Sequence, residues 1–144
     1  MTYPPLTESL LEAYKAAEYI VDDDPPLVLK IGERNDGIRV LHVSFNVETS
    51  AFITAWNPGS KPLSLDENYD RQANLLADIE TMRLNYFVGR GEDISGKWSE
   101  DSYLLLGINQ DQADGLAIKY GQSAYVWIPM SGVPELRLAF NEPG

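Results

Sequence analysis

The chain has 144 residues, 44% of them hydrophobic, which is enough to bury a core, and we expect residues 1–144 to form a single globular domain. The formal net charge is −11 and the 11 Lys and Arg residues are scattered, so binding to nucleic acid is disfavoured. The sequence has no cysteine, no apolar run near the roughly 20 residues of a membrane span, and no signal-peptide pattern at the N-terminus. We therefore expect a cytoplasmic protein that does not bind membranes.

The first predicted element is a helix that begins at an N-cap, Thr7, and continues to Val21. Its apolar residues recur at helical spacing and are Leu10, Tyr14, Ala17 and Val21. Pro25 and Pro26 forbid its continuation, and residues 27–31 then form a short apolar strand.

Residues 36–46 fit two kinds of secondary structure. A strand is favoured by the alternation of apolar and polar residues, with Leu41, Val43, Phe45 and Val47 on one face. A helix is favoured by a capping residue at Asp36 and by one apolar face that contains Ile38, Leu41 and Phe45. The residue pattern leaves both alternatives open.

The middle of the chain predicts a buried strand over residues 49–56 and then a helix over residues 65–84. Ser64 and Glu67 form a capping box at the start of this helix. Its predicted buried stripe consists of Leu65, Tyr69, Ala73, Leu76, Ile79 and Met82. A short strand over residues 86–88 follows.

The rest of the chain continues the same alternation of elements. A charged, glycine-containing loop over residues 89–101 leads to a strand over residues 102–108. Asn109 and Gln112 cap a second helix, which ends at Gly121. A strand over residues 123–128 and an edge strand around Leu136, Leu138 and Phe140 complete the chain.

Residues 50–128 therefore have the order β-α-β-β-α-β, which is typical of an α/β (α+β) domain with a ferredoxin-like core. The N-terminal helix and short strand are additions to this core. In such a sheet, strands 51–56 and 102–108 are antiparallel neighbours in the interior.

Two short runs carry a resemblance to a known family. They are Phe52-Ile53-Thr54-Ala55-Trp56-Asn57-Pro58 and Tyr120-Gly121-Gln122. With Trp98-Ser99-Glu100 and Leu106-Gly107-Ile108 between them, the chain resembles a bacterial family catalogued as domain of unknown function 3293. The similarity extends from the first helix to about Trp127. It implies a helix over residues 36–46, because relatives have one before the Thr-Ala-Trp-Asn-Pro strand, and it implies no activity.

The predicted topology brings polar and aromatic residues together at one end of the sheet. Strand 51–56 ends where strand 102–108 begins, and the N-terminus of helix 65–84 lies beside them. The candidate ligand-binding residues gathered there are Trp56, Asn57, Asn68, Arg71, Trp98, Glu100, Ser102 and Gln122. The alternative is purely structural, because polar residues at the ends of elements commonly cap helices and satisfy strand ends.

Other signals for chemistry are weak. A single histidine, His42, excludes multi-histidine metal sites, and it is interpreted as a surface or hydrogen-bonded helix residue. The run Gly89-Arg90-Gly91 is a poor phosphate signal because no helix follows it. We therefore expect no metal and no cofactor, and no catalytic residue is identified.

Two functions follow from these patterns. The first is a non-catalytic regulatory or protein-interaction module that uses its acidic surface or an edge strand, with a protein as partner. The second is a small-molecule or anion-binding domain, or an enzyme, whose site is the pole around Asn57, Arg71, Glu100 and Gln122. A deep pocket at this pole that contains a carboxylate of raised pKa would favour the second function.

Overall fold

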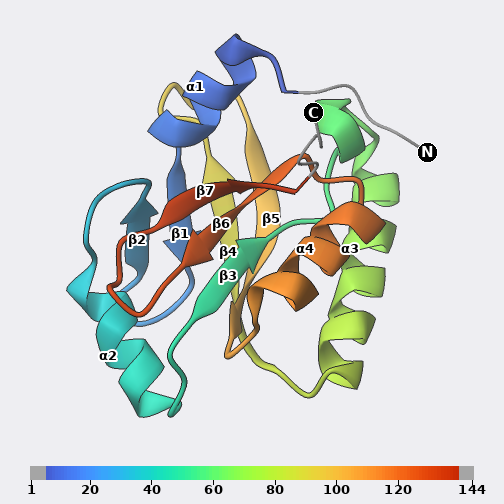
Figure 1. The fold of residues 1–144 in the computed structure, drawn as a ribbon. Coiled ribbons are helices and arrows are strands. Elements are labelled where there is room, and N and C mark those ends of the chain that lie inside the picture. Colours follow the sequence, from blue (N-terminus) through green and yellow to red (C-terminus); the bar gives the residue numbers. More distant parts are fainter. Residues whose placement is uncertain (1–5, 140–144) are drawn as a thin grey trace.

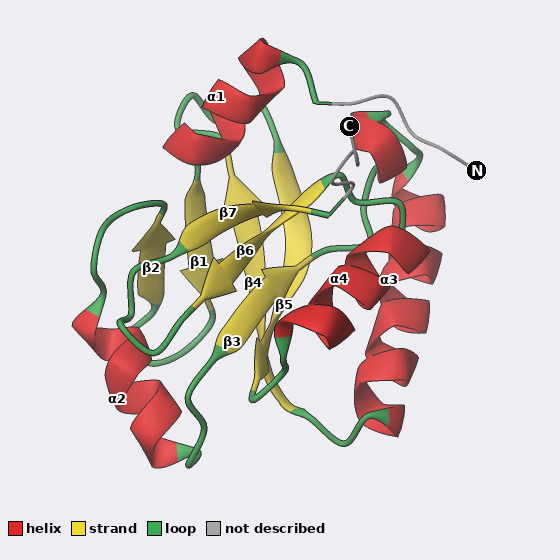
Figure 2. Cartoon of the chain, in the orientation of Figure 1, coloured by secondary structure: helices red, strands yellow, loops and turns green. Residues whose placement is uncertain are grey.

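A computed structural model describes residues 6–139 and shows a mixed α+β fold (Figures 1 and 2). Its helices and strands, with one 3₁₀ turn, are α1 (Glu8–Ala16), β1 (Glu18–Val21), β2 (Leu27–Lys30), α2 (Asp36–Ser44), β3 (Ser50–Ile53), η1 (Pro58–Ser60), α3 (Leu65–Thr81), β4 (Asn85–Glu92), β5 (Ser99–Leu106), α4 (Gln110–Lys119), β6 (Ala124–Ile128) and β7 (Glu135–Leu138). None of the helices within residues 6–139 is both long and apolar enough to cross a bilayer.

The strands form one curled antiparallel sheet in the order β2-β1-β4-β5-β3-β6-β7 (Figure 1). The two ends of the sheet approach each other through backbone hydrogen bonds. The amide of Gly32, after β2, donates to the carbonyl of Pro134, before β7, at 2.8 Å, and the amide of Asn35 donates to the carbonyl of Gly132 at 2.9 Å. These bonds stabilise the curl.

The sheet has a hydrophobic core on each face. Along β3, Ala51 and Ile53 pack with α3 and α4, whereas Phe52 packs on the opposite side with Ile38 and Leu41 of α2. Successive side chains of a strand point to opposite faces of the sheet, and both faces are covered here, so all four residues of β3 are buried. The predicted antiparallel pairing of strands 51–56 and 102–108 is confirmed, since β3 pairs with β5 inside the sheet.

The N-terminal helix is shorter than predicted. It ends at Ala16, and Glu18–Val21 form strand β1 between β2 and β4. The helical spacing of Ala17 and Val21 was therefore misleading. Tyr19, Ile20 and Val21 are β-branched or aromatic, and they gain two hydrogen-bonded neighbouring strands that no local pattern reveals.

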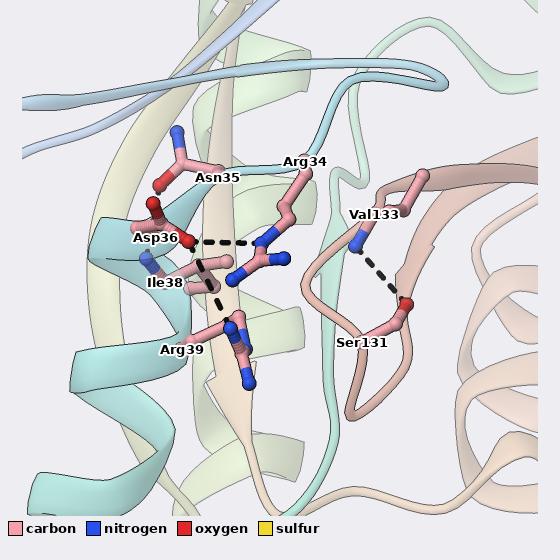
Figure 3. A network of polar contacts seen from close by, with 7 residues as sticks. All are labelled: Arg34, Asn35, Asp36, Ile38, Arg39, Ser131 and Val133. Atoms are coloured by element: carbon pink, nitrogen blue, oxygen red, sulfur yellow. Dashed lines mark hydrogen bonds and ion pairs between the residues drawn. The ribbon is translucent and has the colours of Figure 1, made fainter.

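Residues 36–44 form a helix, so of the two alternatives for this segment the helix that the family resemblance implied is confirmed. The cap is Asn35 rather than Asp36, because the Asn35 side chain accepts a hydrogen bond from the amide of Ile38. Asp36 instead lies between two guanidinium groups, with Arg34 at 2.9 Å and Arg39 at 3.8 Å (Figure 3). An acidic residue in the first turn also suits the helix dipole.

Helix α3 is the longest element, as predicted, and the Ser64 side chain caps it by accepting from the amide of Glu67. The predicted buried stripe is wrong for Leu65 and Tyr69, which are 59% and 52% exposed, and for Ala73, which is also exposed. The face that is buried contains Asn68, Gln72, Leu75 and Ile79. Two polar residues on the buried face concealed it from a pattern based on hydrophobicity.

Gly89 and Gly91 lie in β4, not in a loop, and β5 begins earlier than predicted because it pairs with β4 over its full length. A Cβ atom at Gly89 would lie 2.4 Å from the carbonyl oxygen of Ile20 and 2.9 Å from the ring of Phe52. Glycine at this position permits the close packing of β1 against β4.

Replacing Gly89 with alanine should therefore destabilise the protein by about 2 kcal/mol, because backbone and a packed ring must both move. Gly115→Ala in α4 is the matched control, since a Cβ there meets open space and should stabilise the helix by up to about 1 kcal/mol. Urea unfolding of both variants measures the two effects. Equal stabilities for the two variants would contradict the packing described here.

Candidate functional site

Helix α1 lies over one end of the sheet (Figure 1). A pocket is lined by a residue of this helix and by residues of the sheet. Its free volume is about 50 Å³. Its lining comes from α1, six strands and the connections between them, and consists of Tyr14, Tyr19, Phe52, Thr54, Ser60, Gly91, Trp98, Glu100, Ser102, Gln122, Ser123, Ala124, Tyr125, Val126 and Leu136. One water molecule needs about 10–15 Å³ of such free volume, so the cavity holds only a few atoms.

Four of the eight candidate residues line this pocket, namely Trp98, Glu100, Ser102 and Gln122. Antiparallel pairing brings them together, because β5 begins beside the ends of β3 and β4. The other four, Trp56, Asn57, Asn68 and Arg71, are absent from the lining and lie among the hydrogen bonds that surround it.

Glu100 is the central polar group of the pocket. Burial raises the pKa of its carboxyl from 4.5 to about 7, against the opposing effect of a hydrogen bond from Asn57. The Asn57 Nδ2 atom donates to Glu100 Oε2 at 2.9 Å. None of the ion pairs within residues 6–139 involves Glu100, so no Lys or Arg compensates for its desolvation.

Asn57 is held in place by its neighbours. Its Oδ1 atom accepts from the backbone amide of Leu63 at 2.9 Å and from Asn68 Nδ2 at 2.8 Å. The backbone amide of Asn57 donates to Asn68 Oδ1 at 2.9 Å. Its φ angle of 47° is in the left-handed region, which asparagine tolerates better than most residues. Asn68, which is buried on α3, thus orients the side-chain amide of Asn57 that contacts Glu100.

Arg71 uses two of its nitrogen atoms on the backbone. Nε donates to the carbonyl of Ala55 at 2.7 Å, and Nη2 donates to the carbonyl of Tyr120. The guanidinium therefore joins the end of β3 to the end of α4. This role agrees with the structural alternative, and the anion-binding role of Arg71 stays a prediction.

Arg71→Ala should cost about 2 kcal/mol of unfolding free energy, because it removes the donors to two carbonyl groups. Arg90→Ala removes a guanidinium from an exposed ion pair with Glu92 and should change stability by less than about 1 kcal/mol. Chemical denaturation of the two variants checks this difference. A neutral Arg71→Ala would show that the guanidinium is free for another role.

Gln122 also connects segments that are distant in sequence. Its Nε2 atom donates to the carbonyl of Trp56 at 2.8 Å and to that of Tyr120 at 3.2 Å. The Trp56 ring lies edge-on to Tyr69, with centroids 5.7 Å apart, and its indole nitrogen is buried without a partner among the described residues. The Trp56 ring thus lies outside the pocket lining and contacts α3.

Sequence reasoning did not identify the aromatic residues that α1 and β1 contribute to the pocket. The Tyr14 hydroxyl lies 2.6 Å from Ser60 Oγ, and the Tyr19 hydroxyl donates to the carbonyl of Tyr14 at 2.6 Å. The ring of Tyr14 contacts Trp98 edge-on, at 6.0 Å between centroids. Burial raises the pKa of both tyrosines. Tyr14 fitted a helix stripe, so no local signal separated it from a core residue.

His42 lies outside this pocket, on α2. Its Nε2 atom is 2.7 Å from Ser50 Oγ, and burial lowers the pKa of the imidazole. The residue is buried and hydrogen-bonded, in agreement with a helix residue that serves packing. Residues 6–139 contain no group of three or more side chains suited to hold a metal ion.

One comparison with known proteins gave a match. The family model described as protein of unknown function (DUF3293) matches residues 53–125, from the end of β3 into β6. The matched segment includes all eight candidate residues and excludes Tyr14 and Tyr19. No curated protein and no solved structure matches the chain.

Proposed function

The chain belongs to the DUF3293 family of proteins of unknown function, and we propose that it is a small-molecule-binding domain whose ligand occupies the pocket around Glu100. One observation carries this proposal. A partly buried carboxyl lines a pocket of mainly aromatic and small side chains and has no basic partner among the described residues. Pockets with few polar groups and a perturbed ionisable residue are typical of binding sites.

The stability cost of Glu100 supports the same proposal. A buried carboxyl is normally paired with a cation when its role is structural, because desolvation of the charged form is unfavourable. Within residues 6–139, the neutral amide of Asn57 is the one side-chain partner of Glu100. Groups that reduce stability in this way are commonly retained for function.

Binding is favoured over an interaction module because the pocket and the raised pKa occur at the same residue. The carboxyl could also exchange protons near neutral pH, as a general acid or base does. The proposal stops at binding, since the lining includes no histidine, lysine or cysteine to act as a second catalytic group.

A fragment screen by NMR tests the proposal. The reporters are the indole N–H signal of Trp98 and the side-chain amide signals of Gln122. Ala124→Leu places three more carbon atoms in the pocket and should abolish binding, whereas Ala73→Leu on the exposed face of α3 should not. The proposal fails if no fragment moves these signals, or if binding survives Ala124→Leu in a folded protein.

A second candidate, a protein-interaction module, is favoured by an exposed apolar surface on α2 and the β6–β7 connection. Val40, Val43 and Met130 are 65%, 80% and 65% exposed and line a shared groove together with Arg34 and Arg39. A photo-crosslinking residue at position 43 should capture a partner protein that the same residue at exposed Glu80 does not. Equal capture at both positions would contradict this candidate.

We also propose that residues 50–128 form a ferredoxin-like core and that the protein is cytoplasmic. The core is supported by the strand order β4-β5-β3-β6, with every neighbouring pair antiparallel, and by the packing of α3 and α4 on one face. The cytoplasmic location is supported by the absence of cysteine.

A further inference from the structure

We infer that the ligand of this pocket carries a protonated amine, with the Glu100 carboxylate as its counter-ion and the rings of Tyr14 and Trp98 as its walls. The inference rests on the proposed function and names the ligand class. Three independent features of the pocket support it: unused hydrogen-bond acceptors, unbalanced negative charge and aromatic walls.

Most side-chain hydrogen-bond donors of the lining are already used within the protein; the exceptions are the indole N–H of Trp98 and the hydroxyl of Ser123, which have no acceptor among the described residues. Tyr19 donates to the carbonyl of Tyr14, Thr54 to that of Asp101, Ser102 to that of Glu100, Gln122 to those of Trp56 and Tyr120, and Tyr125 to the carboxylate of Asp114. Only Tyr14 and Ser60 share a bond in which either hydroxyl can donate. Apart from the donors of Trp98 and Ser123, the polar side chains of the lining offer a ligand oxygen lone pairs, which suit a group rich in donors.

The acceptors include the strongest kind that a side chain offers. Glu100 Oε2 accepts from Asn57, whereas Oε1 has no recorded protein donor among the described residues. The amide oxygen of Gln122 likewise has no recorded partner there. An ammonium group has three donors and no acceptor, so it complements this arrangement, and a carboxylate or phosphate does not.

The charge of the lining also favours a cation over an anion as the ligand. Among the described residues, Glu100 is the one carboxyl in the lining, and no Lys or Arg is part of it. An anion would therefore be desolvated beside an uncompensated carboxylate, whereas a cation would restore the missing partner. The net charge of −11 also raises the local concentration of cations at the surface.

Aromatic residues line the same pocket as the carboxyl. Tyr14 and Trp98 are in edge-on contact, as are Tyr19 and Phe52, whose centroids are 5.6 Å apart. Faces of tyrosine and tryptophan attract organic cations, and tryptophan does so most strongly. With about 50 Å³ of free volume, the pocket accepts a small head group, while a longer substituent would lie at its mouth.

Binding of an amine should be coupled to ionisation of Glu100. The pKa of about 7 means that the carboxyl is partly protonated at neutral pH, and only the carboxylate pairs with the ammonium group. The apparent Kd should therefore weaken by about tenfold for each pH unit below 7 and become constant above about pH 8. The amine itself stays protonated throughout this range.

Three probes of equal chain length and different charge test the inference: n-butylammonium, n-butanol and n-butyrate. We expect n-butylammonium to shift the Trp98 indole signal in a saturable way, with n-butanol at least tenfold weaker and n-butyrate without effect. Glu100→Gln should weaken binding of n-butylammonium by at least tenfold and remove its pH dependence. Glu33→Gln removes an exposed acid, so it controls for the change in net charge.

The outcomes distinguish failure of the proposed ligand class from failure of the proposed binding pocket. Binding of n-butanol or n-butyrate at Trp98 without preference for n-butylammonium would overturn the amine and leave the binding pocket standing. Equal loss of n-butylammonium binding in Glu100→Gln and Glu33→Gln would show a general charge effect and would also overturn it. If none of the probes shifts Trp98 while other fragments do, the amine is again excluded; if nothing binds, both proposals fail.

Discussion

Leu75→Asp should prevent the protein from folding. Leu75 is fully buried on α3, in the core cluster that also contains residues of the sheet and of α4, so aspartate there would be a buried charge without a partner. Such a change costs several kcal/mol, which is comparable with the whole stability of a domain of about this size. The expected result is loss of the cooperative thermal transition and of near-UV circular dichroism.

Leu65→Asp is the matched control on the same helix. Leu65 is 59% exposed and occupies the first turn, where an acidic residue suits the helix dipole. The variant should therefore differ from the wild type by less than about 0.5 kcal/mol. The reverse outcome, a folded Leu75→Asp and an unfolded Leu65→Asp, would mean that α3 is rotated so that the stripe predicted from sequence is the buried one.

Glu100→Gln should stabilise the protein by about 2–3 kcal/mol at pH 8 and by much less at pH 5. The folded protein raises the pKa of Glu100 from 4.5 to about 7, so it holds this proton more tightly than the unfolded chain does. The stability that protonation contributes is complete below pH 4.5 and is lost as the pH rises through about 7. Glutamine cannot ionise, and its carbonyl oxygen can still accept the hydrogen bond from Asn57.

Urea unfolding of the wild type and Glu100→Gln between pH 5 and 8 measures this effect as a difference curve. Contributions from other titrating groups, including His42, are common to both proteins and cancel. Glu33→Gln, at an exposed position, is the control and should change stability by less than about 0.5 kcal/mol. A pH-independent difference for Glu100→Gln, or a loss of stability at pH 8, would show that the carboxyl is not desolvated in the folded protein.

Local signals predicted the central part of the fold correctly. Asn109 and Gln112 cap α4, as predicted, and form a capping box there. Ser64 caps α3, but the Glu67 carboxylate accepts from the Ser64 hydroxyl rather than its amide, so the capping box predicted there is half formed. A cap depends on atoms within about one helical turn, so its residues can be recognised without knowing the rest of the structure. The same holds for β3, whose continuous apolar pattern is typical of a strand covered on both faces.

Prediction failed where a distant segment decides the conformation. Glu18–Val21 form a strand because β2 and β4 provide hydrogen-bonding partners on both sides, yet the spacing of their apolar residues also fits a helix. The buried face of α3 carries Asn68 and Gln72, whose side chains accept from the amides of Asn57 and Ala55. Hydrophobicity could not reveal this face, since polar residues there satisfy the backbone that follows β3.

The sequence by itself determined the order of the central elements and the gathering of Asn57, Glu100, Ser102 and Gln122 near one end of the sheet, because strand order places those ends together. Only the tertiary structure decided which of these side chains line a pocket and which bond to the backbone. It also added Tyr14, from a helix distant in sequence, as a wall of that pocket. The physical reason is that burial and hydrogen bonding of a side chain depend on neighbours from the whole chain, whereas sequence patterns report interactions over a few residues.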